Sequence, residues 1–576
     1  MIKKLIILFL IISSYITSIL LYVRQPYNSA CSFVFWITSI LLIFIYLINK
    51  GKITISKTLD LKKFSIKKFL NKNRLIIFIV LMGIIIRFWN LSSIPILTHD
   101  EAKDAGLFPQ KIISGEIKDY FGFHAGINNN FFVLSSIPHL LNIDQVLKVR
   151  LFSALFGTIS IILIYLLTNS ILNKKTALIS AFLLCTYHVH IHFSRTEFLN
   201  LFDGFYALVI LLAFNFSAKA WKINSAILLA TILGLGLHFY SGLRAFILLT
   251  SITFITFIFI KSSFKKFVVL FITFLLFFLI TLGPTISVMT TRKAEFMATG
   301  TASTIISQNQ TPINNLITIA SNYKNSLLAY IQTPIDFHYR YGGPFLIVPF
   351  SIFFLIGLAV TLSRIKKPVY FLIILLIFGI PLLNSAILNT INYTHRLLSL
   401  VPLIILLTAF GIEKSTHLFK IFINKKIQTL LILIICIYFA IYNINLYFRE
   451  NIWEKTLNIN EFRAWEAQKI INRNSNKDII TFFIGNNYYP SFKSVPPLEY
   501  LTQKHTIIDV TNQVILDKIS NYKNYINYLF IIMPENNYMF DKQALIKNLS
   551  TNKIEFERIY YKDIYLFDLL SLSRSN

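Results

Sequence analysis

LIILFLIISSYITSILLYV, residues 5–23, and VLFITFLLFFLITLG, residues 269–283, are the stretches that decide the fold class. Runs of this kind are long and apolar enough to cross about 30 Å of hydrocarbon, because a helix rises about 1.5 Å per residue. The chain of 576 residues is 55% hydrophobic and only 14% charged, whereas a soluble domain carries about 25% charged residues. This composition excludes a soluble enzyme, a disordered chain and a fibrous protein. It predicts a polytopic, all-α membrane protein.

The other apolar runs of the chain predict thirteen transmembrane helices in total, and the charges between them predict an orientation. If the N-terminus is cytoplasmic, the cytoplasmic connections hold 25 Lys and Arg in 63 residues, and the opposite connections hold 14 in 147. This asymmetry has the direction that the positive-inside rule requires. The formal charge of +29 is therefore interpreted as a topology signal and a contact with anionic lipid, and no nucleic acid is expected. The predicted spans are 5–23, 30–48, 75–90, 150–171, 177–193, 201–218, 224–240, 244–260, 267–286, 344–363, 369–388, 397–413 and 427–447.

The pattern divides the chain into three parts. Residues 1–74 hold two spans and a basic cytoplasmic loop, and residues 75–448 form a transmembrane module with long external loops at 91–145 and 287–343. Residues 449–576 lose the apolar runs and are predicted to form a small extracytoplasmic α/β domain. Its segment EFRAWEAQKIINR has the pattern of an amphipathic helix, and DIITFFIG, YLFIIM and IEFERIYYKDIYLF have the pattern of strands.

Ionisable residues at the edges of membrane spans are functional candidates, because burying them near lipid is costly. The sharpest group is THDEAKDAG, residues 98–106, which contains Asp100, Glu101 and Lys103 just after the third span. A carboxylate in this position is a candidate general base for a hydroxyl group. The alternative is a capped helix at the membrane surface whose acidic side chains face water, and the chemistry alone leaves both open.

Several basic and aromatic residues occur at other external span ends. His188, His192 and Arg195 share one helical face, but no HExxH motif accompanies the histidines, so a packed polar helix end is favoured over a metal site. An arginine at the interface suits a phosphate, although a single arginine is equally explained as an anchor that reaches the interface. Further candidates are Tyr240 and Arg244 in GLHFYSGLRAF, Arg340 in HYRYGGP, and His395 and Arg396 in NYTHRLLSLVP.

The order of these motifs resembles a known family. The chain has an Asp-Glu pair in the first long external loop, an SR-x-E turn, a Y-S-x-x-R turn, a loop ending in R-x-G-G-P and an HR-L-x-x-L-x-P span. This order is similar to that of the GT-C fold glycosyltransferases, in particular the superfamily of protein O-mannosyltransferases (family 39) and aminoarabinose-lipid A transferases. The resemblance covers roughly residues 75–447.

The resemblance implies roles for individual residues. Asp100 matches the aspartate that acts as general base on the acceptor hydroxyl, and Glu101 matches its acidic neighbour. Lys103 falls on a position that is basic in some relatives. Arg195, Arg244 and Arg396 fall on basic positions near the lipid phosphate. The further candidates for substrate or phosphate binding, from their place at external span ends, are Tyr240, Arg340 and His395.

One stretch departs from the family pattern. Relatives of the aminoarabinose transferase type carry Glu-Lys-Pro-Pro in the first loop, where this chain has YFGFHAG, residues 120–126. The sequence therefore leaves open whether this protein binds the metal that is associated with that stretch in the relatives. No cofactor is assigned, and the candidate ligands for a divalent metal are Glu101 and His124.

The resemblance implies a multi-pass enzyme of the cell membrane. It would move a sugar from a polyprenyl-phosphate donor to a hydroxyl of a lipid, protein or glycan acceptor on the extracytoplasmic face, with inversion at C1. Three alternatives stay open: a lipid or glycan transporter or flippase, a membrane scaffold whose C-terminal domain binds a partner, and a glycan ligase that uses a lipid-diphosphate donor.

Overall fold

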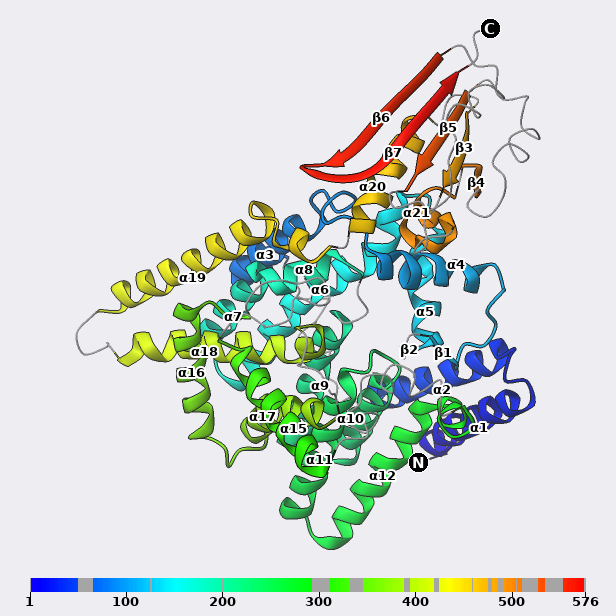
Figure 1. Cartoon of the computed structure of the whole chain (residues 1–576). Helices are drawn as coiled ribbons and strands as arrows, with labels where there is room; N and C mark the ends of the chain where they lie inside the picture. The colour runs from blue at the N-terminus through cyan, green and yellow to red at the C-terminus, as the bar shows by residue number, and fades with distance from the viewer. Residues whose placement is uncertain are drawn as a thin grey trace. The chain divides into compact units, whose positions relative to one another are not determined.

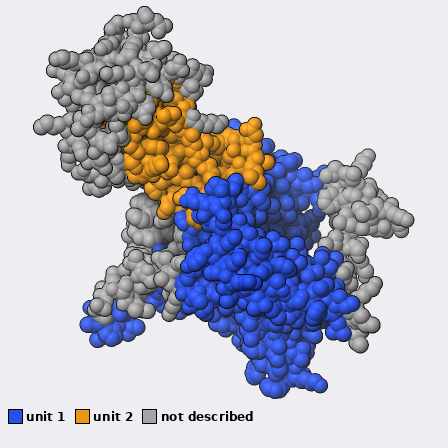
Figure 2. All heavy atoms as spheres, turned by 90° about the vertical axis from the view of Figure 1, so that its right-hand side faces the viewer, with its two compact units in different colours: residues 1–89, 112–137, 150–456 blue, residues 90–111, 138–149, 457–576 orange. Residues whose placement is uncertain are grey.

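The computed structural model describes most of the chain, and its helices and strands fall into two compact units (Figure 2). Unit 1 comprises residues 1–89, 112–137 and 150–456, and unit 2 comprises residues 90–111, 138–149 and 457–576. The described residues are 2–49, 66–124, 127–197, 201–292, 311–331, 345–387, 394–418, 424–457, 459–474, 479–484, 491–503, 505–509, 527–533 and 553–573.

Unit 1 is built almost entirely from helices (Figure 1). Apart from these helices it contains one two-stranded antiparallel pair, β1 (Phe123–His124) with β2 (Ile127–Asn128), among the described residues. Its helices are α1 (Ile2–Arg24), α2 (Ala30–Asn49), α3 (Ile66–Phe88), α5 (Asn129–Ser135), α6 (Gln145–Ile171), α7 (Lys174–Thr186), α8 (His188–Arg195), α9 (Leu201–Ala220), α10 (Ile223–Gly236), α11 (Leu243–Lys261), α12 (Phe264–Leu282), α13 (Thr285–Thr291), α15 (Pro312–Leu328), α16 (Val348–Leu362), α17 (Pro368–Ile387), η5 (Thr394–Leu400), α18 (Val401–Leu418), α19 (Lys425–Phe448) and η7 (Ile452–Thr456).

The described residues contain nine helices that are long and apolar enough to cross a membrane, compared with thirteen predicted spans. Each predicted run falls on a helix, so the difference lies in length and shape. Helices α7 and α8 are bent by 56° at a short break and count as a tenth span only when taken together. Helices α10 and α16 have 14 and 15 residues and reach only about 21–23 Å at 1.5 Å per residue. Helix α3 has basic residues throughout its first turns, so only its second half is apolar.

Small and hydroxylated residues bring the helices of unit 1 together. At Gly411 of α18 an added Cβ would lie 3.0 Å from Cα of Phe353 in α16, so the two backbones touch. Close approach of this kind is typical of membrane helices, which gain little from the hydrophobic effect. The first two helices, α1 and α2, lie side by side (Figure 1) and exchange hydrogen bonds of 2.7 Å between the hydroxyl of each of Ser18 and Ser32 and the carbonyl of the other.

Unit 2 contains a five-stranded mixed sheet in the order β4-β3-β5-β7-β6. Strand β3 pairs in parallel with β4 and β5, and β7 pairs antiparallel with β5 and β6. The β6–β7 hairpin is the red pair in Figure 1. This sheet and helix α20 confirm the predicted small C-terminal α/β domain. The elements of the unit are η1 (Glu101–Leu107), α4 (Phe108–Ile113), η2 (Ile137–Leu140), α20 (Ile459–Arg473), β3 (Ile479–Ile484), η8 (Phe492–Ser494), α21 (Pro496–Leu501), β4 (Ile507–Asp509), β5 (Asn527–Ile532), β6 (Lys553–Tyr561) and β7 (Ile564–Ser573).

The core of unit 2 joins the loop after the third span to the C-terminal domain. Tyr500 of α21 is fully buried, and its hydroxyl donates a hydrogen bond of 3.0 Å to the carbonyl of Gln145. The ring lies against Gly106, where an added Cβ would come within 2.9 Å of it. The segment that carries Asp100 is therefore packed against α21. The buried core consists of Leu97, Ala102, Ala105, Val146, Val149, Tyr500 and Leu501.

Candidate functional site

Asp100 stands directly before a π-helix in unit 2. The π-helix η1 covers seven residues, Glu101–Leu107, and such turns are rare and frequently found at functional sites. Asp100 is half-buried and Lys103 is exposed. The structure thus presents Asp100 at the start of an unusual backbone turn, whereas the sequence pattern predicts an ordinary short helix there.

Glu101 is fully buried and is bonded within its own segment. Its Oε2 accepts hydrogen bonds from the backbone nitrogen of Thr98, at 3.1 Å, and from the Thr98 hydroxyl, at 2.9 Å. The same hydroxyl accepts a bond of 3.3 Å from the nitrogen of Glu101. Next to it, the nitrogen of His99 donates to Oε1 of Glu461 in α20 at 2.9 Å. Glu101 therefore holds the shape of the turn in which Asp100 lies.

Arg195 of α8 caps the end of helix α3 within unit 1. Its Nη1 donates to the carbonyls of Ile86, at 2.7 Å, and Arg87, at 3.1 Å, and its Nη2 donates to the carbonyl of Trp89 at 2.8 Å. The last carbonyls of a helix have no partner within the helix, and a cation is stabilising there. In this geometry the guanidinium of Arg195 is bonded to backbone rather than directed at an open site.

Arg87, near the end of α3, also donates hydrogen bonds to backbone carbonyls. It is fully buried and donates to the carbonyls of Gly83 and Cys185, each at 3.2 Å, while its Nη2 lies 2.8 Å from Nδ1 of His190. We refer to Arg87, Arg195 and the carbonyls that they bind as the α3 cap cluster. Together they join α3 to α7 and α8.

A second charged group lies where α9, α10 and α11 meet, also in unit 1. Asp203, in the first turn of α9, is 1% exposed and is close enough to Arg244 to interact with it electrostatically, as Arg244 is with Tyr240. Both carboxylate oxygens of Asp203 lack a hydrogen-bond partner among the described residues. Gly242 leaves room for the carboxylate, because an added Cβ there would lie 2.5 Å from its Oδ2. We refer to Asp203, Tyr240 and Arg244 as the α9–α11 charge cluster.

The element that carries Arg396 packs next to this cluster. Helix η5 lies against α9, and an added Cβ at Gly204 would come within 3.2 Å of the carbonyl of Leu398. Asp203, Arg244 and η5 are far apart in the sequence, yet the fold brings their elements together. Two predicted positions lie outside what the structure describes, namely Arg340 and the side chain of His395.

Aromatic rings pack beside the α9–α11 charge cluster. The ring of Phe202, next to Asp203, lies 4.8 Å from that of Phe131 and stacks on that of Phe239 at 6.1 Å. Tyr206, one turn further along α9, lies 4.5 Å from Phe239. An apolar wall of this kind lowers the local dielectric constant and so strengthens the interactions of nearby charges.

The metal-ligand candidates of the sequence are Glu101 and His124. His124, in β1, is half-buried and packs with its ring 5.6 Å from that of Phe132. His188 hydrogen-bonds to Asn443. Among the residues that the structure describes, no group of three His, Cys, Asp or Glu side chains is placed to hold a metal ion. We therefore derive no step through a metal.

Arg87 and Asp203 are the charged residues of these clusters that the sequence motifs did not indicate, and Asp203 is the one that belongs to the α9–α11 charge cluster. The signal was present, since it is the only Asp or Glu between Glu197 and Glu295 and it stands in an apolar helix. Acidic residues within membrane segments are rare and mark functional positions. The basic residues recur in motifs, whereas this carboxylate stands alone, and the motif pattern therefore does not indicate it.

Comparison with known proteins supports part of the resemblance. Residues 131–287 match the family model described as "Dolichyl-phosphate-mannose-protein mannosyltransferase". This stretch holds most of α5 through α13, and so includes the α9–α11 charge cluster. The match confirms the predicted resemblance for this part of the chain. A sequence comparison with curated proteins finds no match.

Three solved structures are similar to the chain at low identity. ArnT from Cupriavidus metallidurans bound to undecaprenyl phosphate is 10% identical, with 87% of this chain and 98% of that chain covered and a TM-score of 0.49. The Archaeoglobus fulgidus oligosaccharyltransferase in its apo form is 11% identical, with coverage of 81% and 70% and a TM-score of 0.44. Archaeal AglB from the same organism, in complex with an inhibitory peptide and a dolichol-phosphate, is 12% identical, with coverage of 81% and 70% and a TM-score of 0.43.

Proposed function

We propose that this protein is a membrane glycosyltransferase that moves a sugar from a polyprenyl-phosphate donor to an acceptor hydroxyl on the extracytoplasmic face. The observation that carries the proposal is the α9–α11 charge cluster, which lies within the stretch that matches the mannosyltransferase family model. An arginine beside a buried carboxylate, at the end of a membrane helix, suits a phosphate that is presented from the bilayer.

The chemistry needs few groups. The oxygen of the acceptor hydroxyl forms a bond to C1 of the sugar, and the bond between C1 and the oxygen of the lipid phosphate breaks. The proton of the hydroxyl passes to Asp100, which acts as general base. The leaving group is already a stable phosphate anion, so it needs positive charge rather than a general acid. A single displacement of this kind inverts the configuration at C1.

The residues divide into two roles in this proposal. Asp100 takes the proton, and Glu101 holds the turn that presents it. Arg244, Tyr240 and Arg396 stabilise the phosphate, with Asp203 orienting Arg244. The further substrate or phosphate positions in this proposal are Lys103, Arg340 and His395, whereas Arg195, whose guanidinium is bonded to backbone carbonyls, is assigned to the α3 cap cluster.

The proposal is tested with the purified full-length chain and a panel of polyprenyl-phosphate sugars. Release of the lipid phosphate is measured, and lipid-diphosphate donors in a parallel arm identify a glycan ligase. Asp100→Asn should reduce release by about 10²–10⁴-fold, the usual contribution of a general base, whereas Asp104→Asn in the same segment serves as a matched control. An Asp100→Asn variant with full activity would show that the base is another group. No release from any donor by the unchanged chain would exclude this function.

Sidedness is tested separately. Two variants are made in a chain that carries Cys31→Ser, one with Asp100→Cys and one with Arg396→Cys. Both introduced thiols should react with a membrane-impermeant reagent from the extracytoplasmic side of sealed vesicles. Reaction from opposite sides would rule out a shared role for Asp100 and Arg396 in one reaction.

A further inference from the structure

A pocket opens at the far end of α9 from Asp203, between α9, α10 and α12. Its volume is about 920 Å³, within the range of about 300–1,000 Å³ typical of ligand sites. Asp203 and Ala220, which lines the pocket, are 17 residues apart in α9, so about 25 Å separate this end of the helix from the α9–α11 charge cluster. The loops that border the pocket, 219–223 and 261–266, are predicted to be cytoplasmic. The pocket is therefore distinct from the proposed catalytic site.

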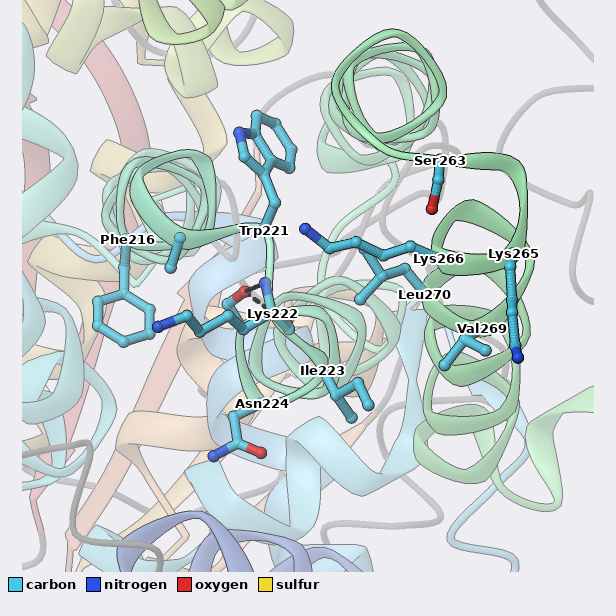
Figure 3. A pocket seen from close by; sticks show the side chains of 12 residues that line it. Phe216, Trp221, Lys222, Ile223, Asn224, Ser263, Lys265, Lys266, Val269 and Leu270 are labelled. Atoms are coloured by element: carbon cyan, nitrogen blue, oxygen red, sulfur yellow. Dashed lines mark hydrogen bonds between the residues drawn. The ribbon is translucent and has the colours of Figure 1, made fainter.

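The pocket is strongly basic. Lys222, Lys265 and Lys266 line it, with Asn224, Ser225 and Ser263 as further polar groups. Figure 3 shows the side chain of Lys266 extending from α12 toward Trp221. No Asp or Glu occurs in the sequence from residue 204 to residue 294, so α9 to α12 and their turns bring no negative charge to this site.

Two helices begin at the pocket. Residues at the start of α10 (Ile223–Gly236) and of α12 (Phe264–Leu282) line it. The two helices pack against each other, and near their other ends an added Cβ at Gly234 would lie 2.8 Å from the carbonyl of Phe278. They are therefore parallel, and both direct their positive N-terminal ends at the same space. Helix N-termini attract anions through their unpaired N–H groups and their dipole.

Trp221 adds an aromatic wall to the pocket. It has a φ of 44°, a conformation that a bulky residue adopts only under constraint. Its ring stacks on that of Phe257 at 6.3 Å with an interplanar angle of 11°. A tryptophan at the end of membrane helices is typical of the level of the lipid headgroups.

We propose that this pocket binds the phosphate-bearing headgroup of an anionic phospholipid from the cytoplasmic leaflet. Basic pockets between membrane helices on the cytoplasmic side bind such headgroups. The ligand chemistry is a phosphate mono- or diester, with the acyl chains remaining in the bilayer beside Phe216, Val269 and Leu270, which also line the pocket.

The test is native mass spectrometry of the full-length chain in mild detergent with dioleoylphosphatidylglycerol or dioleoylphosphatidylcholine. The triple variant Lys222→Gln, Lys265→Gln, Lys266→Gln should bind phosphatidylglycerol at least about tenfold more weakly, because each lysine near the surface contributes to the attraction. The control variant Lys366→Gln, Lys425→Gln, Lys426→Gln loses the same charge from exposed positions outside the pocket and should bind like the unchanged chain. Unchanged binding by the first variant, or equal binding of the two lipids by the unchanged chain, would overturn the proposal. So would displacement of phosphatidylglycerol by inorganic phosphate at a similar concentration, which would identify a free phosphate ion as the ligand.

A second measurement needs no lysine variant. The part of the tryptophan fluorescence that disappears in Trp221→Phe should be quenched more strongly by brominated phosphatidylglycerol than by brominated phosphatidylcholine. Equal quenching by the two lipids would contradict a headgroup site at Trp221 even if the triple variant failed to fold.

Discussion

The α3 cap cluster and the α9–α11 charge cluster are both built from buried charged side chains in unit 1, but their bonding differs. In the α3 cap cluster, Arg195 donates three hydrogen bonds to backbone carbonyls at the end of α3. In the α9–α11 charge cluster, both carboxylate oxygens of Asp203 lack a hydrogen-bond partner among the described residues, although Arg244 is close enough to interact electrostatically.

This difference separates charge that maintains the fold from charge that suits a ligand. A buried polar group that has its hydrogen bonds stabilises the structure, whereas one that lacks them carries an energetic cost. Such a cost is retained at sites where a ligand or a reaction uses the group. We therefore expect substitutions in the first cluster to change stability and substitutions in the second to change activity.

Among substitutions in these two clusters, the largest effect is expected for Arg244→Gln. Loss of the guanidinium removes positive charge that stabilises the departing phosphate, and lipid-phosphate release should fall by about 10²–10³-fold. The thermal midpoint in detergent should stay close to that of the unchanged chain when Arg244→Gln is combined with Asp203→Asn, because no buried carboxylate is then left without its countercharge. If the Arg244→Gln variant retained its activity, the two clusters would not differ in role, and the α9–α11 charge cluster would also be structural.

Arg195→Gln should show the opposite pattern. The guanidinium donates three hydrogen bonds to the end of α3, and their loss should lower the free energy of unfolding by about 3 kcal/mol. The measurement is the thermal midpoint, with release per folded molecule as the second readout. A strong loss of donor use at an unchanged midpoint would instead support the phosphate role that the sequence motif predicts for Arg195.

Asp203→Asn should have a smaller effect, exerted through Arg244. The carboxylate orients the guanidinium, so its neutralisation should lower kcat/KM by about tenfold, or about 1.4 kcal/mol. The double variant with Arg244→Gln should be no worse than Arg244→Gln alone, because the two residues act as a pair. Additive losses would show that Asp203 acts independently of Arg244.

The smallest effect concerns pH and extends the comparison to unit 2. His139 places its Nε2 2.8 Å from the carbonyl of Ala105 in η1, and burial holds the pKa of His139 below its usual value of 6.5. The unfolded chain therefore binds more protons below about pH 6.5, so the stability contribution of the neutral ring is present above that pH and is lost as the pH falls. The protection factors of the amide hydrogens in residues 98–107 should therefore fall as the pH is lowered from about 7.5 to about 5.5. His139→Gln should remove this dependence, and a persisting dependence would assign it to another group.

Local patterns in the sequence were sufficient to predict much of this architecture. The apolar runs became helices, and the alternating segments after residue 449 became α20 and the strands β3, β5, β6 and β7. These predictions succeed because hydrophobic periodicity is a local property of the chain. The number of spans was less predictable, since the bend of 56° between α7 and α8 and the short lengths of α10 and α16 depend on packing against other helices.

The residue types of the candidate site could be predicted from the sequence, but the roles of the individual residues could be predicted only in part. The motifs contain both Arg195 and Arg244 at external span ends, and nothing in their spacing distinguishes one from the other. Asp203 and Arg244 are 41 residues apart in the sequence, as the numbering shows, and only the approach of α9 to α11 makes them a pair.

By itself, the sequence determined that this is a multi-pass membrane protein with a small C-terminal α/β domain, and it supplied an ordered set of charged motifs. Only the three-dimensional arrangement of the helices shows that Arg195 is hydrogen-bonded to backbone carbonyls, whereas the carboxylate of Asp203 has no hydrogen-bond partner among the described residues. The physical reason is that burial and composition follow from the residues in one stretch, whereas the satisfaction of a polar group depends on what distant stretches place within about 3 Å of it.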